Sequence, residues 1–345
     1  MGRQRLMYQI TEPLEKVEDS NVYQGDSLEV MKLLPSNCCH LAFTSPPYAG
    51  KFRAYSQKGD PRDLGQLDVD EYVDAFVPYV KEIERLLKHE DGGVFILNIG
   101  EKYYDGFASL YPEKLLLKII EETQFNLIDK VPWIKLDPMP NKKTRVGTLG
   151  WEHIYVFGTQ TKDINRNWEY MKSPYKTTTS SISLRRDYKR MRKQTNHPMN
   201  DAKCFDDIGA NPRNYIMAHN EPSSREEYDY LEQHYCISAT QSIRGSNHEA
   251  QMPHHVAEFF IGGYSQEGQT VLDPFGGSGT TAAVSWRLNR NYIHIDLMKK
   301  NCEYTEKRVN AIPRRKSLFN FYGLSESDKS KLSQVQEQTK SKGLF

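Results

Sequence analysis

The sequence predicts an α/β protein built on a mostly parallel sheet. Short apolar runs typical of buried strands alternate with longer segments whose apolar residues recur every three to four positions, from Asn21 to about Gln160 and again from Asn247. The 345 residues, 38% of them hydrophobic, are enough to bury one large core or two smaller ones. Strands that alternate with helices are typical of a parallel sheet with helices packed against it.

In the first half, three apolar runs predict buried strands and two amphipathic segments predict helices. The strands are expected at residues 40–45, 92–100 and 153–158, in "HLAFTS", "GGVFILNIG" and "HIYVFG". The helices are expected in "DEYVDAFVPYVKEIERLLK" and "YPEKLLLKIIEETQ", where apolar residues lie on one face at helical spacing.

The pattern returns in the last hundred residues. "EAQMPHHVAEFFIGGY" predicts a helix that ends at its glycines, "TVLDPF" a strand, "GGSGTTAAVSWRL" a glycine turn into a helix, and "NYIHIDL" the next strand. These elements continue the same α/β order after a long interruption.

The interruption, from Thr161 to about Arg244, is polar, basic and without periodicity. Between Thr161 and Lys203, eleven Lys and Arg stand against four Asp and Glu, a local net charge of 11 − 4 = +7. The whole chain carries +1, so the rest holds about +1 − 7 = −6. A basic block in an otherwise acidic chain fits a surface that faces a polyanion, and fits a solvated face about equally well.

These composition changes give the expected domain organisation. It comprises an N-terminal arm at 1–20, two halves of one α/β domain at 21–160 and 246–315, an inserted segment at 161–245, and a polar tail at 316–345.

Cysteine usage and hydropathy exclude several protein classes. The five cysteines are odd in number, two are adjacent, and none form a CxxC pair, which argues against a disulfide framework or a zinc site. The ten histidines show no metal-ligand spacing, so no metal is expected. No apolar run approaches the ~18–20 residues of a membrane span, and the N-terminus lacks a signal-peptide core. A cytoplasmic protein is the expectation.

The segment "VLDPFGGSGTTAAVSWRLNRNYIHIDL" has the layout of a nucleotide-type cofactor site. A buried strand enters a turn that holds Gly276, Gly277 and Gly279, and about twenty residues later another strand ends at Asp296. Glycines let a ligand approach the backbone, and the acidic residue can hold ribose hydroxyls. The lysine of a P-loop and the spacing of GxGxxG are both missing, so a ligand with a ribose but no phosphate fits better. S-adenosylmethionine is such a ligand.

A second motif, "TSPPY" at 44–48, ends the first predicted strand. Together, "TSPPY" and "DPFGGSGTT" resemble the DNA amino-methyltransferases, with "TSPPY" in the form used by N4-cytosine enzymes. The catalytic motif precedes the cofactor motif, which is similar to the permuted β subgroup. "YQGDSLEVMKLLPSNCCHLAFTSPPY", "PWIKLDPMP", "WEHIYVF" and "NHEAQMPHHVAEFFI" resemble further family segments, with Met252 at a position usually held by Phe. The resemblance covers roughly residues 21–160 and 247–310.

The resemblance implies a Rossmann-like fold that binds S-adenosylmethionine, with helices on both faces and one antiparallel strand near the edge of the sheet. His294 is a departure, because the family usually has Gly two residues before the acidic residue; its ring either crowds the cofactor edge or points elsewhere. The cofactor-binding residues that the resemblance implies are Asp26, His248, Asp273, Phe275, Gly276, Gly277, Gly279, Thr280 and Asp296.

The chemistry of an exocyclic amine explains the residues of the catalytic motif. The amine is a poor nucleophile because its lone pair is delocalised into the ring, so acceptors aimed at its protons assist methyl transfer. The Ser45 hydroxyl and the Pro46 carbonyl are expected to supply them. Pro46 and Pro47 stiffen the turn and remove N–H donors. Tyr48 is expected to stack on a base flipped out of the duplex, at a cost of a few kcal/mol.

Several residues keep two interpretations each. Asp26 resembles a position near the cofactor adenine, and it is also placed to cap a helix that begins near Leu28. His248 is a cofactor-side residue or an ordinary solvated histidine. Trp133 lines the base pocket or belongs to the core. Asn98 contacts the substrate or caps a turn.

The basic segment "SLRRDYKRMRKQTNH" at 183–197 is expected to be the target-recognition region, because arginine can pair with guanine and lysine neutralises phosphate. The residues expected to bind DNA are Arg185, Arg186, Lys189, Arg190, Arg192 and Lys193.

Three alternatives stay open at this point. The first is methylation of adenine N6, whose enzymes usually have Asp or Asn where Ser45 stands. The second is an RNA substrate, and the third a non-catalytic DNA-binding or cofactor-sensing protein on the same fold. The expected partner is double-stranded DNA, with a separate restriction endonuclease and the oligomeric state left open.

Overall fold

The computed structural model describes residues 9–17, 20–50, 60–104, 106–135, 150–160, 164–171, 216–218 and 252–313. These residues fall within one compact unit, Met1–Met171 with Pro212–Pro313. The second unit, Lys172–Asn211 with Arg314–Phe345, lies outside the described residues. Among the described helices, none combines the length and hydropathy needed to cross a membrane.

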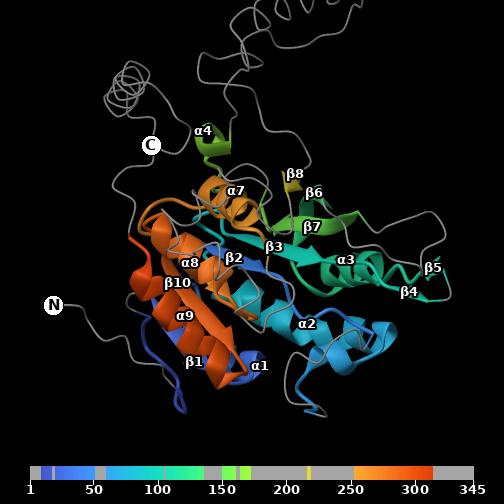
Figure 1. Ribbon diagram of the computed structural model, residues 1–345, viewed down its shortest axis with the longest axis horizontal. Coiled ribbons are helices and arrows are strands. Elements are labelled where there is room, and N and C mark those ends of the chain that lie inside the picture. The colour runs from blue at the N-terminus through green and yellow to red at the C-terminus, as the bar shows by residue number, and fades with distance from the viewer. Residues whose placement is uncertain are drawn as a thin grey trace, which may run out of the picture. The chain divides into compact units, whose positions relative to one another are not determined.

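An eight-stranded sheet forms the centre of this unit (Figure 1). In spatial order its strands are β1 (Asn21–Gln24), β10 (Asn291–Asp296), β9 (Thr270–Asp273), β2 (Leu41–Thr44), β3 (Val94–Ile99), β7 (Trp151–Gly158), β6 (Asn126–Lys135) and β8 (Ile216–Ala218).

The sheet is mostly parallel. The first five strands in the spatial order run parallel to one another, and β7 runs antiparallel to both β3 and β6. The expected α/β class and the antiparallel strand near the edge are therefore confirmed. Because β2 and β9 are neighbours, the two halves of the chain meet in the middle of the sheet.

Helices cover both faces. One face carries α1 (Ser27–Leu33), α2 (Val69–Leu86) and α3 (Tyr111–Glu122), and the other carries α7 (His254–Tyr264), α8 (Thr280–Arg287) and α9 (Lys299–Ala311).

Strand alternation explains these two layers, since successive side chains point to opposite faces. In β1, Val22 packs with α8 and α9 residues, whereas Tyr23 joins the core under α1, α2 and α3. In β2, Ala42 faces that same core, and Phe43 stacks on Phe260 of α7 at 5.9 Å between ring centroids. Buried side chains on both faces stabilise the sheet by roughly 1.5–3 kcal/mol each.

Helix α7 differs from its prediction because it continues through both glycines to Tyr264. The short helix α4 (Trp168–Met171) packs against this stretch. A Cβ at Gly262 would overlap the Tyr170 ring, and one at Gly263 would lie 2.6 Å from Met171 Cγ. The glycines therefore provide room for α4 and do not end the helix.

Two pieces of the inserted segment belong to this sheet unit. Helix α4 packs on α7, and β8 pairs in parallel with β6. The 3₁₀ helix Leu64–Gln66 and the hairpin of β4 (Tyr103–Tyr104) and β5 (Phe107–Ala108) complete the described elements.

Candidate active site

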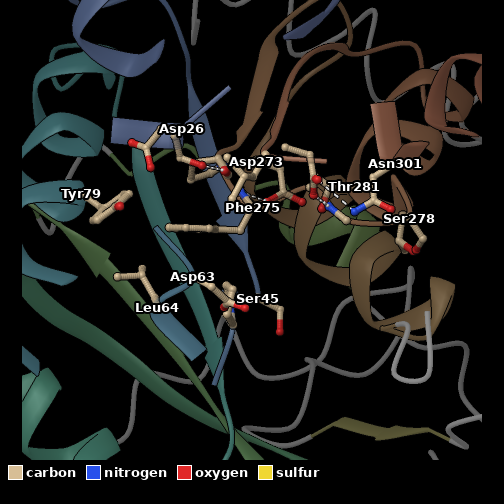
Figure 2. A pocket seen from close by; sticks show the side chains of 18 of the residues that line it. Asp26, Ser45, Asp63, Leu64, Tyr79, Asp273, Phe275, Ser278, Thr281 and Asn301 are labelled. Carbon is tan, nitrogen blue, oxygen red and sulfur yellow. Dashed lines mark hydrogen bonds between the residues drawn. The ribbon is translucent and has the colours of Figure 1, made fainter. Parts of the chain in front are cut away.

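A pocket lies at the carboxyl ends of the parallel strands (Figure 2), where α/β sheets bind ligands. Asp26 follows β1, Ser45 follows β2, Asp273 ends β9 and Asp296 ends β10. The lining residues are Asp26, Ser27, Ser45, Pro47, Arg62, Asp63, Leu64, Tyr79, Met252, Asp273, Pro274, Phe275, Gly276, Gly277, Ser278, Thr280, Thr281, Asp296, Leu297 and Asn301.

The glycine turn forms one wall of this pocket. Gly277 and Gly279 have φ of 52° and 76°, in the left-handed region that side chains disfavour. The Gly276 N–H donates to the Ile295 carbonyl at 2.9 Å, which fixes the turn to β10. The turn then leads into α8 at Thr280, as its sequence predicted.

The side chain of Asp273 joins the two sequence motifs. It accepts a hydrogen bond from Thr44 Oγ1 at 2.7 Å and another from the Phe275 N–H at 3.1 Å. Thr44 is the first residue of "TSPPY", so this bond ties the catalytic turn to the glycine turn. Burial raises the pKa of Asp273 to about 6, against the opposing effect of its hydrogen-bond donors.

Asp296 is placed to hold hydroxyl groups. Its carboxylate accepts from Gly277 N at 2.9 Å, Met298 N at 2.7 Å and Asn301 Nδ2 at 2.9 Å. Since a carboxylate has about four lone-pair positions, acceptor capacity remains on the pocket side. Burial raises the pKa of Asp296 to about 6.

A cluster of aromatic side chains forms the apolar side of the pocket. The Phe275 ring packs against Phe76 at 5.8 Å and against Tyr79 at 5.3 Å between centroids. Phe275 and Tyr79 both line the pocket, and Leu64 lies beside them in Figure 2. These side chains offer a flat apolar ligand group, such as a purine, a surface to pack against beside the polar turn.

Asp26 caps a helix and also lines the pocket. Its carboxylate caps α1 by accepting from Leu28 N at 3.0 Å and Glu29 N at 3.2 Å. It also lines the pocket. The neighbouring Ser27 hydroxyl donates to the Pro274 carbonyl, which joins the start of α1 to the glycine turn.

His294 points away from the pocket. Its side chain is fully buried and lies directly under Gly276, where a Cβ would overlap the imidazole ring. His294 Nε2 and Thr305 Oγ1 are 3.5 Å apart. The histidine therefore fills the space beneath the turn and does not crowd the cofactor edge.

Two residues of the catalytic motif line the same pocket. Ser45 and Pro47 line it, while Pro46 is buried. The Tyr48 ring lies against Gly100, where a Cβ would be 2.7 Å from Tyr48 Cε2. The structure thus brings Ser45 together with Asp273, Gly276 and Asp296, although they lie far apart in the sequence.

A partly buried hydrogen-bond network extends from Ser45 to a buried carboxylate. Ser45 Oγ and Tyr48 Oη are 3.2 Å apart, and Tyr48 Oη donates to Glu152 Oε2 at 2.7 Å. Asn98 Nδ2 lies 3.2 Å from Ser45 Oγ, 3.0 Å from Tyr48 Oη and 2.9 Å from Glu152 Oε2. Asn98 therefore contacts the catalytic motif and does not cap a turn. Burial, and then the charge of Glu152, raise the pKa of Tyr48 well above its usual value.

Trp133 lies beside this network on β6, opposite Glu152 of β7. Its side chain is buried and does not line the pocket. Lys135 Nζ lies 5.2 Å from the Trp133 ring centroid and 2.5 Å from Glu152 Oε1.

The sequence interpretation missed Glu152 and Lys135. One signal was present, because Glu152 and His153 are the polar residues of an otherwise apolar strand. Buried charges are costly unless paired, and such a residue calls for a partner. The partners come from the loop after β2, from β3 and from β6, and the sequence alone does not show that these segments converge.

In the described part of the chain, Glu101, Glu113 and His153 place ligand atoms within 4.8 Å of one another. Each carboxylate has a protein partner, since Glu101 Oε1 accepts from Ser109 Oγ at 2.6 Å and Glu113 Oε1 lies 3.3 Å from Lys130 Nζ. Burial lowers the pKa of His153 to about 4. This group is an ordinary polar cluster.

The remaining predicted site residues lie outside the described residues. They are His248, Arg185, Arg186, Lys189, Arg190, Arg192 and Lys193.

Comparisons with known proteins agree with this arrangement. The type II methyltransferase M.PvuII of Proteus hauseri is 26% identical over 303 residues, which are 83% of this chain and 82% of that protein. The DNA adenine methyltransferase YhdJ of Escherichia coli (strain K12) is 25% identical over 321 residues, 91% of this chain and 88% of that protein. The solved structure of PvuII DNA methyltransferase (cytosine-N4-specific) shares the fold, with a TM-score of 0.58 at 22% identity, covering 88% of this chain and 90% of that chain.

A family model for the N6 and N4 methyltransferases, described as DNA methylase, matches residues 39–307. This range is most of the chain and includes both the "TSPPY" turn at Ser45 and the glycine turn at Gly276. Both turns line one pocket. The protein therefore belongs to the DNA methylase family of N6 and N4 amino-methyltransferases.

Proposed function

We propose that this DNA methyltransferase transfers a methyl group to the N4 amine of cytosine. The observation that carries the proposal is Ser45, which lines the cofactor pocket and whose hydroxyl takes part in a partly buried hydrogen-bond network. A neutral hydroxyl and a backbone carbonyl at this position are the N4 form of the motif that the sequence resembles.

S-adenosylmethionine is the methyl donor of this family, and the pocket residues fit it. Asp296 retains acceptor capacity for ribose hydroxyls, the glycine turn admits close approach, and Phe275 with Tyr79 offers an apolar surface for adenine. When bound, this cofactor supplies an electrophilic methyl group on a sulfonium sulfur. We assign cofactor binding to Asp26, Asp273, Phe275, Gly276, Gly277, Gly279, Thr280 and Asp296.

The residues of the catalytic turn act by positioning. Ser45 Oγ and the Pro46 carbonyl accept hydrogen bonds from the amine, which draws its lone pair out of conjugation with the ring. Pro46 and Pro47 hold the turn rigid, so the acceptors need no reorganisation when the substrate binds. The Tyr48 ring stacks on the flipped base while its hydroxyl keeps its hydrogen bond to Glu152.

Adenine N6 is the second candidate, because the chain is similar over 91% of its length to a relative named as a DNA adenine methyltransferase. Ser45 argues for cytosine, since the adenine form usually has Asp or Asn at this place. Both reactions use the same cofactor pocket, so the identity of the methylated base decides between them.

We assign sequence recognition to the inserted segment at 161–245, whose basic residues Arg185, Arg186, Lys189 and Arg190 would contact phosphate and guanine. We also propose a role in restriction-modification beside a separate endonuclease, on the likeness to a relative named as a type II methyltransferase.

The test of the catalytic assignment is Ser45→Ala. We expect methyl transfer to be abolished while the dissociation constants for S-adenosylmethionine and duplex DNA stay within about twofold of the wild type. A variant that retains the wild-type kcat would refute the role of Ser45. A variant that fails to bind the cofactor would show a structural role instead.

A further inference from the structure

The hydrogen-bond network that contacts Ser45 includes Asn98 and Glu152, which lie outside the "TSPPY" motif. It brings together a buried carboxylate, a buried carboxamide and a half-buried phenol, contributed by β7, β3 and the loop after β2. Glu152 is only 7% exposed, and burial of a charged group is costly unless it is paired and hydrogen-bonded.

The two oxygens of Glu152 have different partners. Oε1 forms an ion pair with Lys135 Nζ at 2.5 Å, whereas Oε2 accepts from Tyr48 Oη at 2.7 Å and Asn98 Nδ2 at 2.9 Å. A structural ion pair would need only the first oxygen. The second oxygen faces the catalytic turn.

The carboxylate fixes the direction of the hydrogen bonds. As the anion of an ion pair, Glu152 can only accept, so the Tyr48 hydroxyl directs its proton to Oε2. Tyr48 Oη is then an acceptor toward its other neighbours, and the Ser45 hydroxyl, 3.2 Å away, donates to it.

These directions determine which hydrogen bonds Ser45 Oγ can accept. With its proton directed at Tyr48, its lone pairs are left to accept, one from Asn98 Nδ2 at 3.2 Å and the other from a substrate amine. Successive hydrogen bonds in such a series polarise one another, which makes Ser45 Oγ a stronger hydrogen-bond acceptor. The raised pKa of Tyr48 keeps its phenol protonated, as the chain requires.

We propose that Glu152 is a positioning residue that, through Tyr48 and Asn98, holds Ser45 as a hydrogen-bond acceptor for the substrate amine. This proposal rests on the proposed function and extends it, because it explains how a serine serves where related adenine enzymes usually present Asp or Asn directly. In this protein two hydrogen bonds, through Tyr48 or through Asn98, connect the carboxylate to the serine.

The first test measures kcat, KM for DNA and cofactor affinity for Glu152→Ala, Glu152→Gln and Tyr48→Phe. Glu152→Ala should lower kcat about 100-fold or more, with KM and cofactor affinity within about threefold of the wild type. Glu152→Gln keeps an oxygen that accepts from Tyr48, so it should recover at least tenfold over Glu152→Ala. Tyr48→Phe keeps the ring and loses only the hydroxyl, and should also lower kcat.

A double-mutant cycle tests whether Glu152 acts on Ser45 through the Tyr48 hydroxyl. If Glu152 acts through the Tyr48 hydroxyl, the kcat of Glu152→Ala/Tyr48→Phe should be close to that of Glu152→Ala alone. Multiplied losses would overturn the proposal. A second pattern would also overturn the proposal: Tyr48→Phe keeps the wild-type kcat, and Lys135→Met lowers kcat as much as Glu152→Ala does. That pattern would show that Glu152 matters only as part of a structural ion pair.

Two controls separate misfolding and substrate identity from the proposal. Glu122→Gln removes an exposed carboxylate that, within the described residues, forms ion pairs with Lys81 and Lys118 at the surface, and its kcat should equal the wild type. Thermal unfolding of each variant identifies losses that merely follow stability. Digestion of the methylated DNA names the product base, so an adenine product would refute the cytosine assignment while the effect of Glu152 on kcat is still measured.

Discussion

Replacing Gly276 with alanine should destabilise the glycine turn by steric overlap alone. Gly276 lies outside the left-handed backbone region, so alanine brings no φ strain there. Its Cβ would lie 2.8 Å from Cγ of His294 and closer still to Nδ1 and Cε1. The imidazole is fully buried, so moving it aside would displace neighbouring core side chains.

The size of the effect follows from two opposing contributions. Overpacking a buried site costs about 1–3 kcal/mol. Restricting the unfolded chain by Gly→Ala returns about 0.4–1 kcal/mol. The net loss in the free energy of unfolding is therefore about 1–2 kcal/mol. For a domain of this size, that loss lowers Tm by about 1–4 °C.

The assay is thermal and urea unfolding of Gly276→Ala in the wild-type and His294→Ala backgrounds. Without the imidazole the alanine methyl has room, so the penalty should vanish and the cycle should show a coupling of about 1–2 kcal/mol. Gly158→Ala is the matched control, since its Cβ meets chiefly the flexible end of Ile128. An unchanged Tm for Gly276→Ala, or a penalty that persists without His294, would refute the steric reasoning.

Other predictions concern the two pocket carboxylates. Asp296→Ala should weaken S-adenosylmethionine binding by about 2 kcal/mol, roughly 30-fold, measured by calorimetry; unchanged affinity would remove it from the cofactor site. Burial raises the pKa values of Asp273 and Asp296 to about 6, above the unfolded value, so each stabilises the protein below about pH 4 and this contribution is lost as pH rises through 6. The unfolding free energy of the wild type should therefore rise more between pH 7 and 5 than that of Asp296→Asn, and equal slopes would contradict the prediction. Cofactor affinity should change in the opposite sense, weakening below about pH 6 as Asp296 is protonated.

The sequence predicted the sheet and the pocket because their signals are local. Buried strands, amphipathic helices and the glycine turn each lie within about twenty residues, and parallel strands put their carboxyl ends at one edge. Ser45 and Asp296 could therefore be assigned to one site from the sequence.

What the sequence did not predict depends on contacts between distant segments. Gly262 was expected to end a helix, yet it makes room for Tyr170. The orientation of His294 depends on the space under Gly276. Glu152 acquires its role from Tyr48, which lies 104 residues earlier in the chain. No periodicity within one element reports such pairings.

The most direct test of the account is the identity of the methylated base. The wild-type protein is incubated with labelled S-adenosylmethionine and mixed-sequence duplex DNA, the DNA is digested to nucleosides, and the product is identified by mass. N4-methylcytosine is the predicted product, because Ser45 and the Pro46 carbonyl present the acceptors of the N4 form. N6-methyladenine would contradict the cytosine assignment while leaving the family and cofactor intact, and an absence of methylated nucleoside would contradict the catalytic account as a whole.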